Sequence, residues 1–244
     1  MIDIHAHILP GIDDGATSLD EAVAMARAAA DAGCEAIFAT PHQRHPHWRN
    51  ENRTGLAALR ERLQNAVGDT PRILAGAEIR VDDAFLDDFL GPHPAVPGGE
   101  ILPLGDSRYL LIEFPRDGIG PAPETVVHEL VVAGWRPILA HPELLPWLGP
   151  DLNRLDDLVK AGATLQITAM SLTGEFGARP RHDADALVSA GLTHFVASDC
   201  HGVTRRPPGL ARAYHRLAQE WDETLARQLT EGNPRAVLED RPLP

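Results

Sequence analysis

The sequence predicts an α/β fold in which parallel strands alternate with helices, formed by residues 1–244 as one domain. Short apolar runs alternate along the chain with amphipathic segments, which is the pattern of repeated strand–helix units. The length of 244 residues allows one large domain or two small ones. The Gly/Pro-rich stretches at 91–99 and 115–123 are typical of long loops rather than of domain linkers, so one domain is favoured.

Each element of this fold has a local signal. Ser18 followed by Glu21 is a capping box that predicts the start of the first helix, and Gly33 predicts its end. Amphipathic patterns predict further helices at 54–67, 121–133, 151–161, 183–190 and 208–230. Apolar runs predict seven strands at 2–5, 36–40, 72–78, 109–113, 137–141, 164–168 and 194–199.

The charge of the chain excludes one large class of partner. The 22 Lys and Arg residues against 35 Asp and Glu residues give a net charge of −13. This argues against nucleic acid, because a protein that binds it must neutralise phosphates with cationic side chains. The acidity fits instead a soluble protein that concentrates cations, or one whose positive charge comes from bound metal. The 12 histidines are more than an ordinary fold requires.

Cysteine usage and the start of the chain favour a cytoplasmic location. Cys34 and Cys200 cannot build a disulfide framework, which favours a reducing compartment. The opening residues lack the basic and apolar regions of a secretory signal. No stretch reaches the roughly 18 apolar residues needed to cross a bilayer, so we expect no membrane span. The sequence does not indicate an oligomeric state.

Polar residues follow six of the seven predicted strands. In chain order these are His5 with His7, His42, Glu78, Glu113, His141, and Asp199 with His201. The strand at 164–168 carries Gln166 and Thr168 instead. In a barrel of parallel strands all carboxyl ends lie on one face, where active sites are built. We therefore expect these residues to converge on one site.

The residue types at these strand ends predict a metal centre. His5 and His7 lie on the same side of an extended strand and can share one ion. A mixed set of imidazoles and carboxylates suits Mn, Fe or Zn. Asp13 and Asp14 add oxygen ligands, although Asp13 also fits an Asx turn before the first helix. So many ligands predict two or three ions bridged by a carboxylate, either Glu78 or Asp199, and bridged ions would lower the pKa of a shared water for phosphate-ester hydrolysis.

Two competing kinds of chemistry are disfavoured. A barrel with a metal-bridging carbamylated lysine needs lysine at a strand end, and the only lysine, Lys160, lies late in a predicted helix. Cys200 and Arg206 have the spacing used by cysteine-dependent tyrosine phosphatases. However, residues 201–205 contain one glycine and Cys200 lies between two predicted metal ligands, so we expect a packed thiol instead.

Motifs along almost the whole chain resemble those of the polymerase-and-histidinol-phosphatase (PHP) superfamily. The first is MIDIHAHILPGIDDG at 1–15, and the others are ATPH (39–42), GAEIR (76–80), LIEFP (111–115), AHPE (140–143), LQIT (165–168), SDCH (198–201) and RPP (206–208). Within the superfamily the chain is most similar to the bacterial CpsB/YwqE-type protein-tyrosine phosphatases linked to capsule and exopolysaccharide synthesis.

This resemblance implies a distorted (β/α)7 TIM-like barrel of PHP type and a hydrolase that removes phosphate from tyrosine with a metal-bridged hydroxide. It implies three divalent ions, with manganese favoured and iron or zinc as alternatives. The first ion would be held by His5, His7, Glu78 and Asp199. The second would be held by Glu78, Glu113 and His141. The third would be held by Asp14, His42 and His201.

The resemblance also implies catalytic roles and a partner. Arg206 would grip the phosphate with its forked donors, and His42 or His201, near the third ion, would act in proton transfer. The partner would be a phosphotyrosine protein, such as a bacterial tyrosine kinase of polysaccharide synthesis. The family has a second arginine directly after the His-Pro-Glu motif, where this chain has Leu144.

The missing arginine leaves several possibilities open. Arg44, Arg49 or Arg80 would replace it from another loop, or each is an ordinary solvated arginine. The loop at 43–54, with Trp48, covers the substrate or is a plain surface loop. Leu144 favours the alternative of a phosphatase for a small phosphorylated metabolite or sugar phosphate. A non-catalytic binding module is a further, less favoured reading, because the ligand set is complete.

Overall fold

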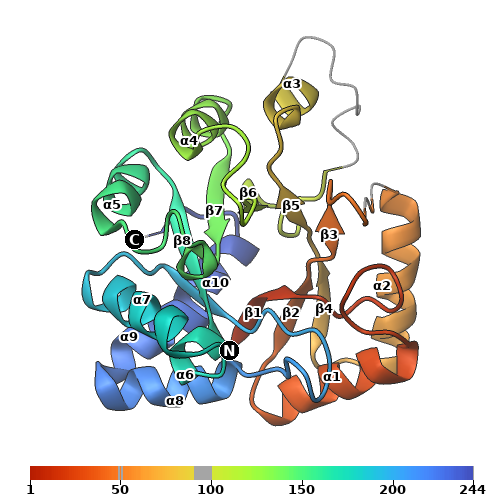
Figure 1. The fold of residues 1–244 in the computed structure, drawn as a ribbon. Coiled ribbons are helices and arrows are strands. Elements are labelled where there is room, and N and C mark those ends of the chain that lie inside the picture. The colour runs from red at the N-terminus through yellow and green to blue at the C-terminus, as the bar shows by residue number, and fades with distance from the viewer. Residues whose placement is uncertain (49, 51, 91–100, 244) are drawn as a thin grey trace.

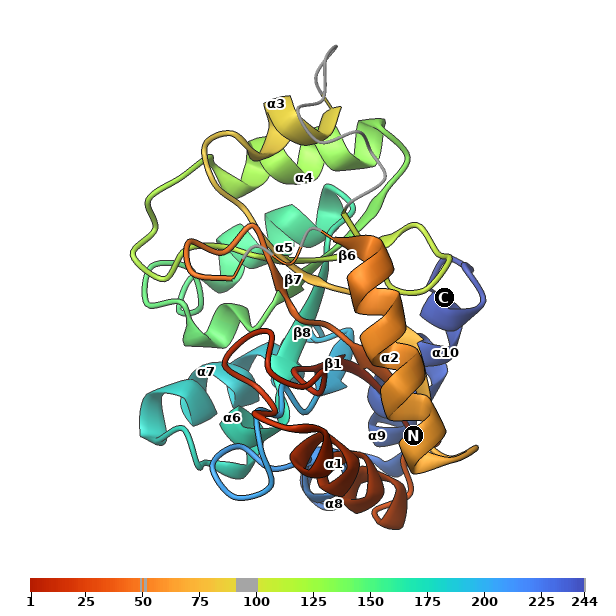
Figure 2. The ribbon, with the colours of Figure 1, turned by 90° about the vertical axis from the view of Figure 1, so that its right-hand side faces the viewer.

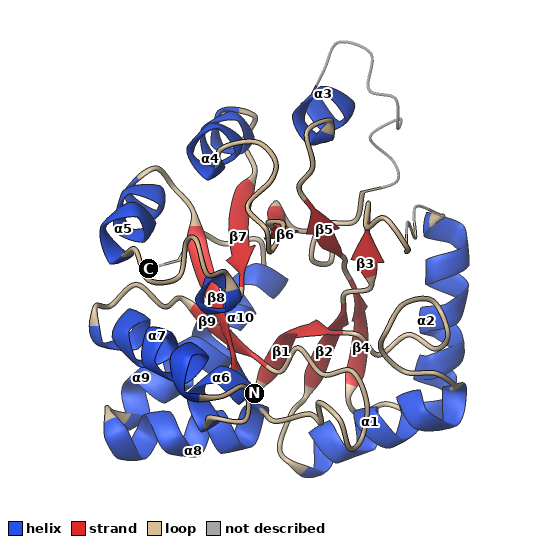
Figure 3. Cartoon of the chain, in the orientation of Figure 1, coloured by secondary structure: helices blue, strands red, loops and turns tan. Residues whose placement is uncertain are grey.

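The computed structural model describes residues 1–48, 50, 52–90 and 101–243 and has a mixed α/β fold with parallel sheets (Figure 1). Strands lie at the centre and helices lie around them (Figure 3). The predicted loop at 91–99 and Arg49 lie outside the described residues. In the described part of the chain, no helix is both long and apolar enough to span a membrane.

The strands form two parallel sheets. They are β1 (Ile2–Ala6), β2 (Ala36–Ala39), β3 (His42–Gln43), β4 (Arg72–Ala75), β5 (Glu78–Arg80), β6 (Tyr109–Glu113), β7 (Arg136–Ala140), β8 (Thr164–Thr168) and β9 (Phe195–Ala197). One sheet has the order β1-β2-β4 and the other has the order β3-β5-β6-β7-β8-β9. An isolated parallel bridge between Ala6 and Cys200 joins β1 to the segment after β9.

Two of the predicted strands are interrupted in the structure. The predicted strand at 36–40 ends at Ala39 and resumes at His42, after Pro41, which has no N–H for a ladder hydrogen bond. The predicted strand at 72–78 breaks at Gly76, where a Cβ atom would lie 2.9 Å from the Leu104 side chain. Beyond both breaks, His42 pairs in register with Glu78, so the interruptions place two predicted ligands side by side.

The first helices follow their sequence signals. Helix α1 (Leu19–Asp31) begins where predicted, and its Ser18 cap accepts a hydrogen bond from the Glu21 N–H. Helix α2 (Arg53–Val67) is capped by Asn52 and packs beside α1 (Figure 2). The next helices are α3 (Phe85–Leu90), α4 (Pro123–Val132), the 3₁₀ turn η1 (Pro142–Leu144), α5 (Leu152–Lys160), α6 (Ala169–Thr173) and α7 (Ala178–Ser189).

The last predicted helix, at 208–230, is divided into several elements. These are α8 (Leu210–Glu220), α9 (Glu223–Arg227), the π-helical η2 (Gln228–Gly232) and α10 (Asn233–Leu238). The division falls at Asp222, whose side chain accepts a hydrogen bond from the Thr224 N–H and therefore caps a new helix. Sequence periodicity alone did not mark this capping residue, so the break at Asp222 was missed.

Alternate residues of the same strand pack into two different hydrophobic clusters. In β6, Leu110 and Ile112 join the large cluster, whereas Tyr109 and Leu111 join a smaller one with residues such as Phe38. This division follows from the twofold alternation of side chains along a strand. Both faces of the strands are therefore filled by apolar side chains, and the polar residues at the carboxyl ends rest on this packed support.

Candidate metal centre

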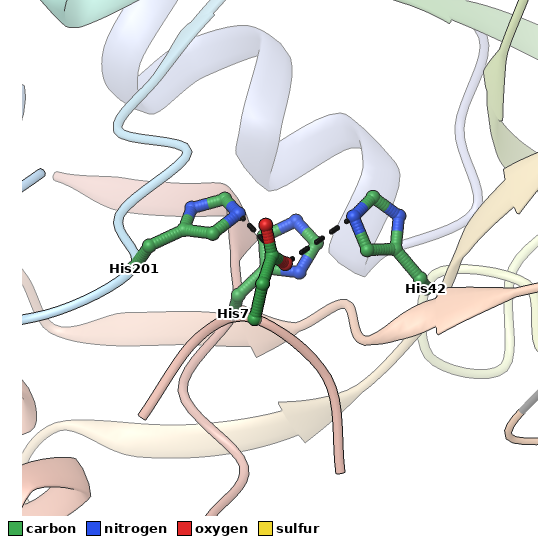
Figure 4. A group of neighbouring side chains, drawn as sticks. His7, His42 and His201 are labelled. Atoms are coloured by element: carbon green, nitrogen blue, oxygen red, sulfur yellow. Dashed lines mark ion pairs between the residues drawn. The ribbon is translucent and has the colours of Figure 1, made fainter. Parts of the chain in front are cut away.

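The nine predicted ligands lie close together at the carboxyl ends of the strands. Their ligand atoms fall into four groups in which all atoms lie within 4.8 Å of one another. The groups are His7, Asp14, His42 and His201; His5, His141 and Asp199; His5, His7 and Glu78; and His42, Glu78 and Glu113. Figure 4 shows His7, His42 and His201 close together, with ion pairs drawn from His42 and His201 to one carboxylate.

His5 and His7 are oriented with their Nε2 atoms toward each other. The Nδ1 atom of His5 lies 2.9 Å from Oε1 of Gln166, and that of His7 lies 2.9 Å from Oδ2 of Asp13. Amide and carboxylate oxygens only accept, so both Nδ1 atoms donate and each carries a proton. The two Nε2 atoms lie 3.2 Å apart, and in neutral rings their lone pairs would be free to share one cation.

The carboxylate of Glu78 lies at the centre of the cluster. It is fully buried, and its Oε2 lies 3.2 Å from Nε2 of His7 and 2.9 Å from Nδ1 of His42. Its other oxygen lies 2.8 Å from Nε2 of His141. Burial raises the pKa of Glu78, but the surrounding imidazoles outweigh this effect and hold the pKa well below its usual value. Glu78 therefore has the position expected of a bridging carboxylate.

Asp14 joins two imidazoles from opposite parts of the chain. Its Oδ1 lies 3.5 Å from Nε2 of His42 and 3.2 Å from Nε2 of His201. Burial lowers the pKa of His42, but Glu78 and Asp14 outweigh it and raise the pKa to about 11. Carboxylates that attract protons this strongly would bind a divalent cation in the same place, with release of those protons.

Several buried atoms of the cluster have no hydrogen-bond partner. Among the described residues they include Asp14 Oδ1, His42 Nδ1, Glu113 Oε2 and His141 Nδ1. Some of these atoms are close to an opposite charge but lack hydrogen-bond geometry, as His42 Nδ1 is beside Glu78. Buried polar atoms are normally paired. Imidazole and carboxylate atoms that converge without pairing fit divalent metal ions.

The backbone is strained at two of the strand ends. His141 has a φ of 36° and Asp199 has a φ of 50°, both in the left-handed region that residues other than glycine rarely adopt. Strain of this kind persists where the surrounding structure fixes a side chain for function. The left-handed backbone at these positions directs the side chains of His141 and Asp199, two potential ligands, toward the cluster.

The grouping of atoms differs in part from the one that the resemblance implies. The set of Asp14, His42 and His201 lies together as expected, with His7 added. Glu113 lies with Glu78 but is grouped with His42, whereas His141 is grouped with His5 and Asp199. Burial and the neighbouring Glu78 raise the pKa of Glu113, so the two carboxylates repel each other. A cation between them would remove this repulsion.

Arg206 lies at the edge of the cluster and lines the site cavity. Its guanidinium donates to Asp199 Oδ2, and its Nη1 lies 3.4 Å from Nε2 of His201. It also lies over the ring of Phe176, at 5.4 Å from the centroid. The Arg206 Nε is buried and has no hydrogen-bond partner among the residues that the structure describes.

The arginines considered as replacements at Leu144 have different environments. Arg44 forms ion pairs with Asp82 and Asp88, at 2.7 and 3.0 Å, and is therefore already neutralised. Arg80 lies 4.0 Å from Glu113 and is close to the cluster. Nearby, Trp48 stacks on His42, with 5.6 Å between ring centroids, which places the described part of the 43–54 loop beside the site.

The competing chemistries have no support in the structure. Cys200 is buried, and burial raises the pKa of its thiol well above the usual value, so the reactive thiolate is disfavoured. Lys160 is exposed at the end of α5 and forms an ion pair with Asp156. Cys200 joins none of the groups of described side chains that could hold a metal ion.

Three residues near the site have roles that sequence reasoning missed. Gln166 orients His5, although the strand carrying it was expected to contribute no metal ligand. Glu143 is fully buried and accepts hydrogen bonds from the Thr168 N–H and the Ser171 hydroxyl, which ties the turn after β7 to β8. Arg116 lines the site cavity. Only Gln166, at a strand end, had a position that pointed to the site.

Comparisons with known proteins identify the family of this chain. Residues 1–239 match the family described as capsular polysaccharide synthesis, CpsB/CapC. The tyrosine-protein phosphatase YwqE of Bacillus subtilis (strain 168) is 38% identical over 235 residues, covering 95% of this chain and 89% of that protein. The tyrosine-protein phosphatase CpsB of Streptococcus pneumoniae is 30% identical over 248 residues, covering 99% of both.

Similarity to a solved structure supports the same family assignment. That structure belongs to the work on YwqE from Bacillus subtilis and CpsB from Streptococcus pneumoniae, described as unique metal-dependent tyrosine phosphatases. Its TM-score is 0.90 at 35% identity, and the match covers 100% of this chain and 96% of that one. The chain thus belongs to the CpsB/CapC family of capsular polysaccharide synthesis.

Proposed function

We propose that this protein is a metal-dependent phosphatase that hydrolyses phosphotyrosine in proteins, including a bacterial tyrosine kinase of polysaccharide synthesis. One observation carries the proposal: nine imidazole and carboxylate residues from separate strand ends converge in a largely buried cluster and leave several atoms unpaired. Three divalent ions, with manganese favoured, match a ligand set larger than one ion needs. Relatives named as tyrosine-protein phosphatases support the substrate.

The chain's own residues would divide the chemistry between them. Bound divalent ions would supply Lewis acidity and a water of lowered pKa for attack on phosphorus. Arg206, at the edge of the cluster, would bind the phosphoryl oxygens and neutralise their charge. His42 and His201 lie beside Asp14 and would move protons near the leaving oxygen. The departing tyrosine oxygen needs little acid assistance, because a phenol has a pKa of about 10.

The finer architecture belongs to the same proposal. If β2 with β3 and β4 with β5 each count as one interrupted strand, seven strands remain, and the bridge between Ala6 and Cys200 would close them into a distorted barrel. Such a barrel would make residues 1–244 a single PHP-type domain. The cytoplasmic location stays a prediction from the sequence.

Replacement of metal ligands tests the proposal. His5→Ala and Asp199→Ala should each lose bound metal and phosphotyrosine phosphatase activity, while circular dichroism shows that the fold is retained. Cys200→Ser should keep both metal and activity and serves as the matched control. Full activity in protein shown by elemental analysis to be free of metal would contradict the proposal.

A second candidate function is hydrolysis of a small phosphorylated metabolite or sugar phosphate. Two observations favour it: the site cavity is only about 190 Å³, and apolar Leu144 lines it. Comparison of kcat/KM for phosphotyrosine peptides and for small phosphomonoesters separates the two functions. A preference for the small esters would favour this second candidate.

A further inference from the structure

Arg116 lines the same cavity as the candidate metal ligands. The cavity of about 190 Å³ is also lined by Arg206 and Leu144. This volume is below the ~300 Å³ at which pockets for larger ligands begin. In so small a space, one phosphoryl group would lie within reach of both arginines.

The charge of Arg116 is available to a ligand. Its side chain is exposed and has no ion pair or hydrogen bond with any residue that the structure describes. By contrast, Arg206 donates to Asp199, and Arg44 is held by two aspartates. An unpaired guanidinium at a cavity is well suited to bind a phosphate, because its planar donors match two oxygens at once.

The backbone that carries Arg116 is held in place. The Gly118 N–H donates to the Pro115 carbonyl oxygen at 3.0 Å, which closes a tight turn around Arg116. The indole of Trp147 donates to the same oxygen at 3.1 Å. Gly118 has a φ of 73° and lies against the Trp147 ring, where a Cβ atom would come within 3.2 Å. The turn is therefore fixed before a ligand arrives, which lowers the entropic cost of binding.

A phosphate bound in this cavity needs contacts with cationic groups. Four carboxylates line it, from Asp14, Glu78, Glu113 and Asp199. A phosphate monoester is an anion and is repelled by any carboxylate that bound ions do not fully neutralise. Leu144 lines the cavity without charge, so this part of the wall provides no cation.

We propose that Arg116 contacts the phosphoryl group of the substrate together with Arg206 and determines how tightly phosphate is held. This inference rests on the proposed phosphatase function. It assigns Arg116 to substrate binding and not to metal binding, because a guanidinium stays protonated and offers no lone pair to a cation.

Binding of inorganic phosphate to the manganese-loaded protein tests this role directly, by calorimetry. Arg116→Ala should weaken phosphate binding about 10- to 100-fold, the loss expected for a charge-assisted hydrogen bond. It should raise KM for a phosphotyrosine peptide similarly, with a smaller change in kcat and unchanged metal content. The control Arg72→Ala removes an exposed arginine at the opposite ends of the strands and should change phosphate affinity less than twofold.

A second variant keeps the test decisive. Leu144 lines the same cavity, so Leu144→Arg in the Arg116→Ala background should restore most of the phosphate affinity. Unchanged phosphate affinity and KM in a folded, metal-loaded Arg116→Ala protein would overturn the role of Arg116. Failure of the metal-loaded wild type to hydrolyse any phosphomonoester would instead reject the phosphatase function, whatever Arg116 does.

Discussion

Polar side chains occupy both ends of the parallel strands, but they find partners at one end and face one another at the other. At the amino ends, Asp240 accepts hydrogen bonds from Arg108 and Arg136, and the Tyr109 hydroxyl donates to the Arg241 carbonyl oxygen. At the carboxyl ends lie all the described residues with unpartnered buried side-chain atoms except Thr193.

This difference indicates that polar groups at the amino ends of the strands contribute to stability, whereas those at the carboxyl ends are suited to binding a ligand. At the amino ends, the contacts of Asp240 and Arg241 with residues of the sheet hold the last turn of the chain against the strands. Unpaired groups at the carboxyl ends cost free energy unless a ligand satisfies them. The same strands therefore carry stabilising contacts at their amino ends, here called the amino edge, and the candidate site at their carboxyl ends, here called the carboxyl edge.

The largest effect is expected from Glu78→Gln. The change keeps the shape but removes the charge that contacts the imidazoles of His7, His42 and His141. We expect at least a ~100-fold loss of kcat/KM, because a metal ligand matters at least as much as the residues that orient one. Elemental analysis should show less bound metal. Wild-type metal content and activity in this variant would remove Glu78 from the centre of the site.

A pair of glutamines sharpens the comparison between the two edges. Gln166 orients His5, so Gln166→Ala should weaken metal binding by about 10- to 100-fold. Gln64 instead accepts from the Ile73 N–H and donates to Gly68 and Pro71 carbonyl oxygens at the amino end of β4. Gln64→Ala should lower the free energy of unfolding by about 1–2 kcal/mol with unchanged metal affinity. Metal titrations and denaturant unfolding of both variants measure these effects, and equal loss of metal affinity would contradict the assignment.

The carboxyl-end site was largely predictable from the sequence, because parallel topology alone brings strand ends together. His5, Glu78 and Asp199 needed only the prediction of a strand before them. The breaks at Pro41 and Gly76 were not predictable, since the second depends on the Leu104 side chain, distant in sequence. The position of Arg116 depends on Trp147 in the same way.

The amino edge was hardly predictable at all. The pairing of Asp240 with Arg108 joins residues far apart in the chain, and no local pattern marks it. Helix α10, which follows the division of the predicted helix at 208–230, contacts β1. Local signals therefore identified elements and strand ends, but not the contacts made by loops and by the chain's last turn.

A smaller effect is expected from Asp240→Ala at the amino edge. The variant loses the acceptor shared by Arg108 and Arg136, and we expect a loss of about 1 kcal/mol in the free energy of unfolding, reduced by partial exposure. Activity of the metal-loaded variant should stay within twofold of wild type. A large loss of activity at unchanged stability would mean that the two edges are not separate in function.

The smallest effect concerns pH at the same edge. Burial lowers the pKa of His194 below its ordinary value of 6.5, and its Nδ1 accepts from the Leu165 N–H. The unfolded chain binds a proton here more readily, so this contribution to stability is complete above pH 6.5 and declines as the pH falls. Wild type should therefore lose stability relative to His194→Gln between pH 7.5 and 5.5, by less than ~1 kcal/mol in denaturant unfolding. A pH-independent difference would show that His194 does not titrate in this way.

The central claim is that the carboxyl-end cluster holds the ions that make this protein a phosphatase. The most direct measurement is titration of metal-stripped protein with Mn²⁺ while hydrolysis of a phosphotyrosine peptide is followed. Activity should rise from the background level to a plateau as the predicted three ions bind, and a chelator should abolish it. Undiminished hydrolysis by the stripped protein, with no response to the added ion, would contradict the claim.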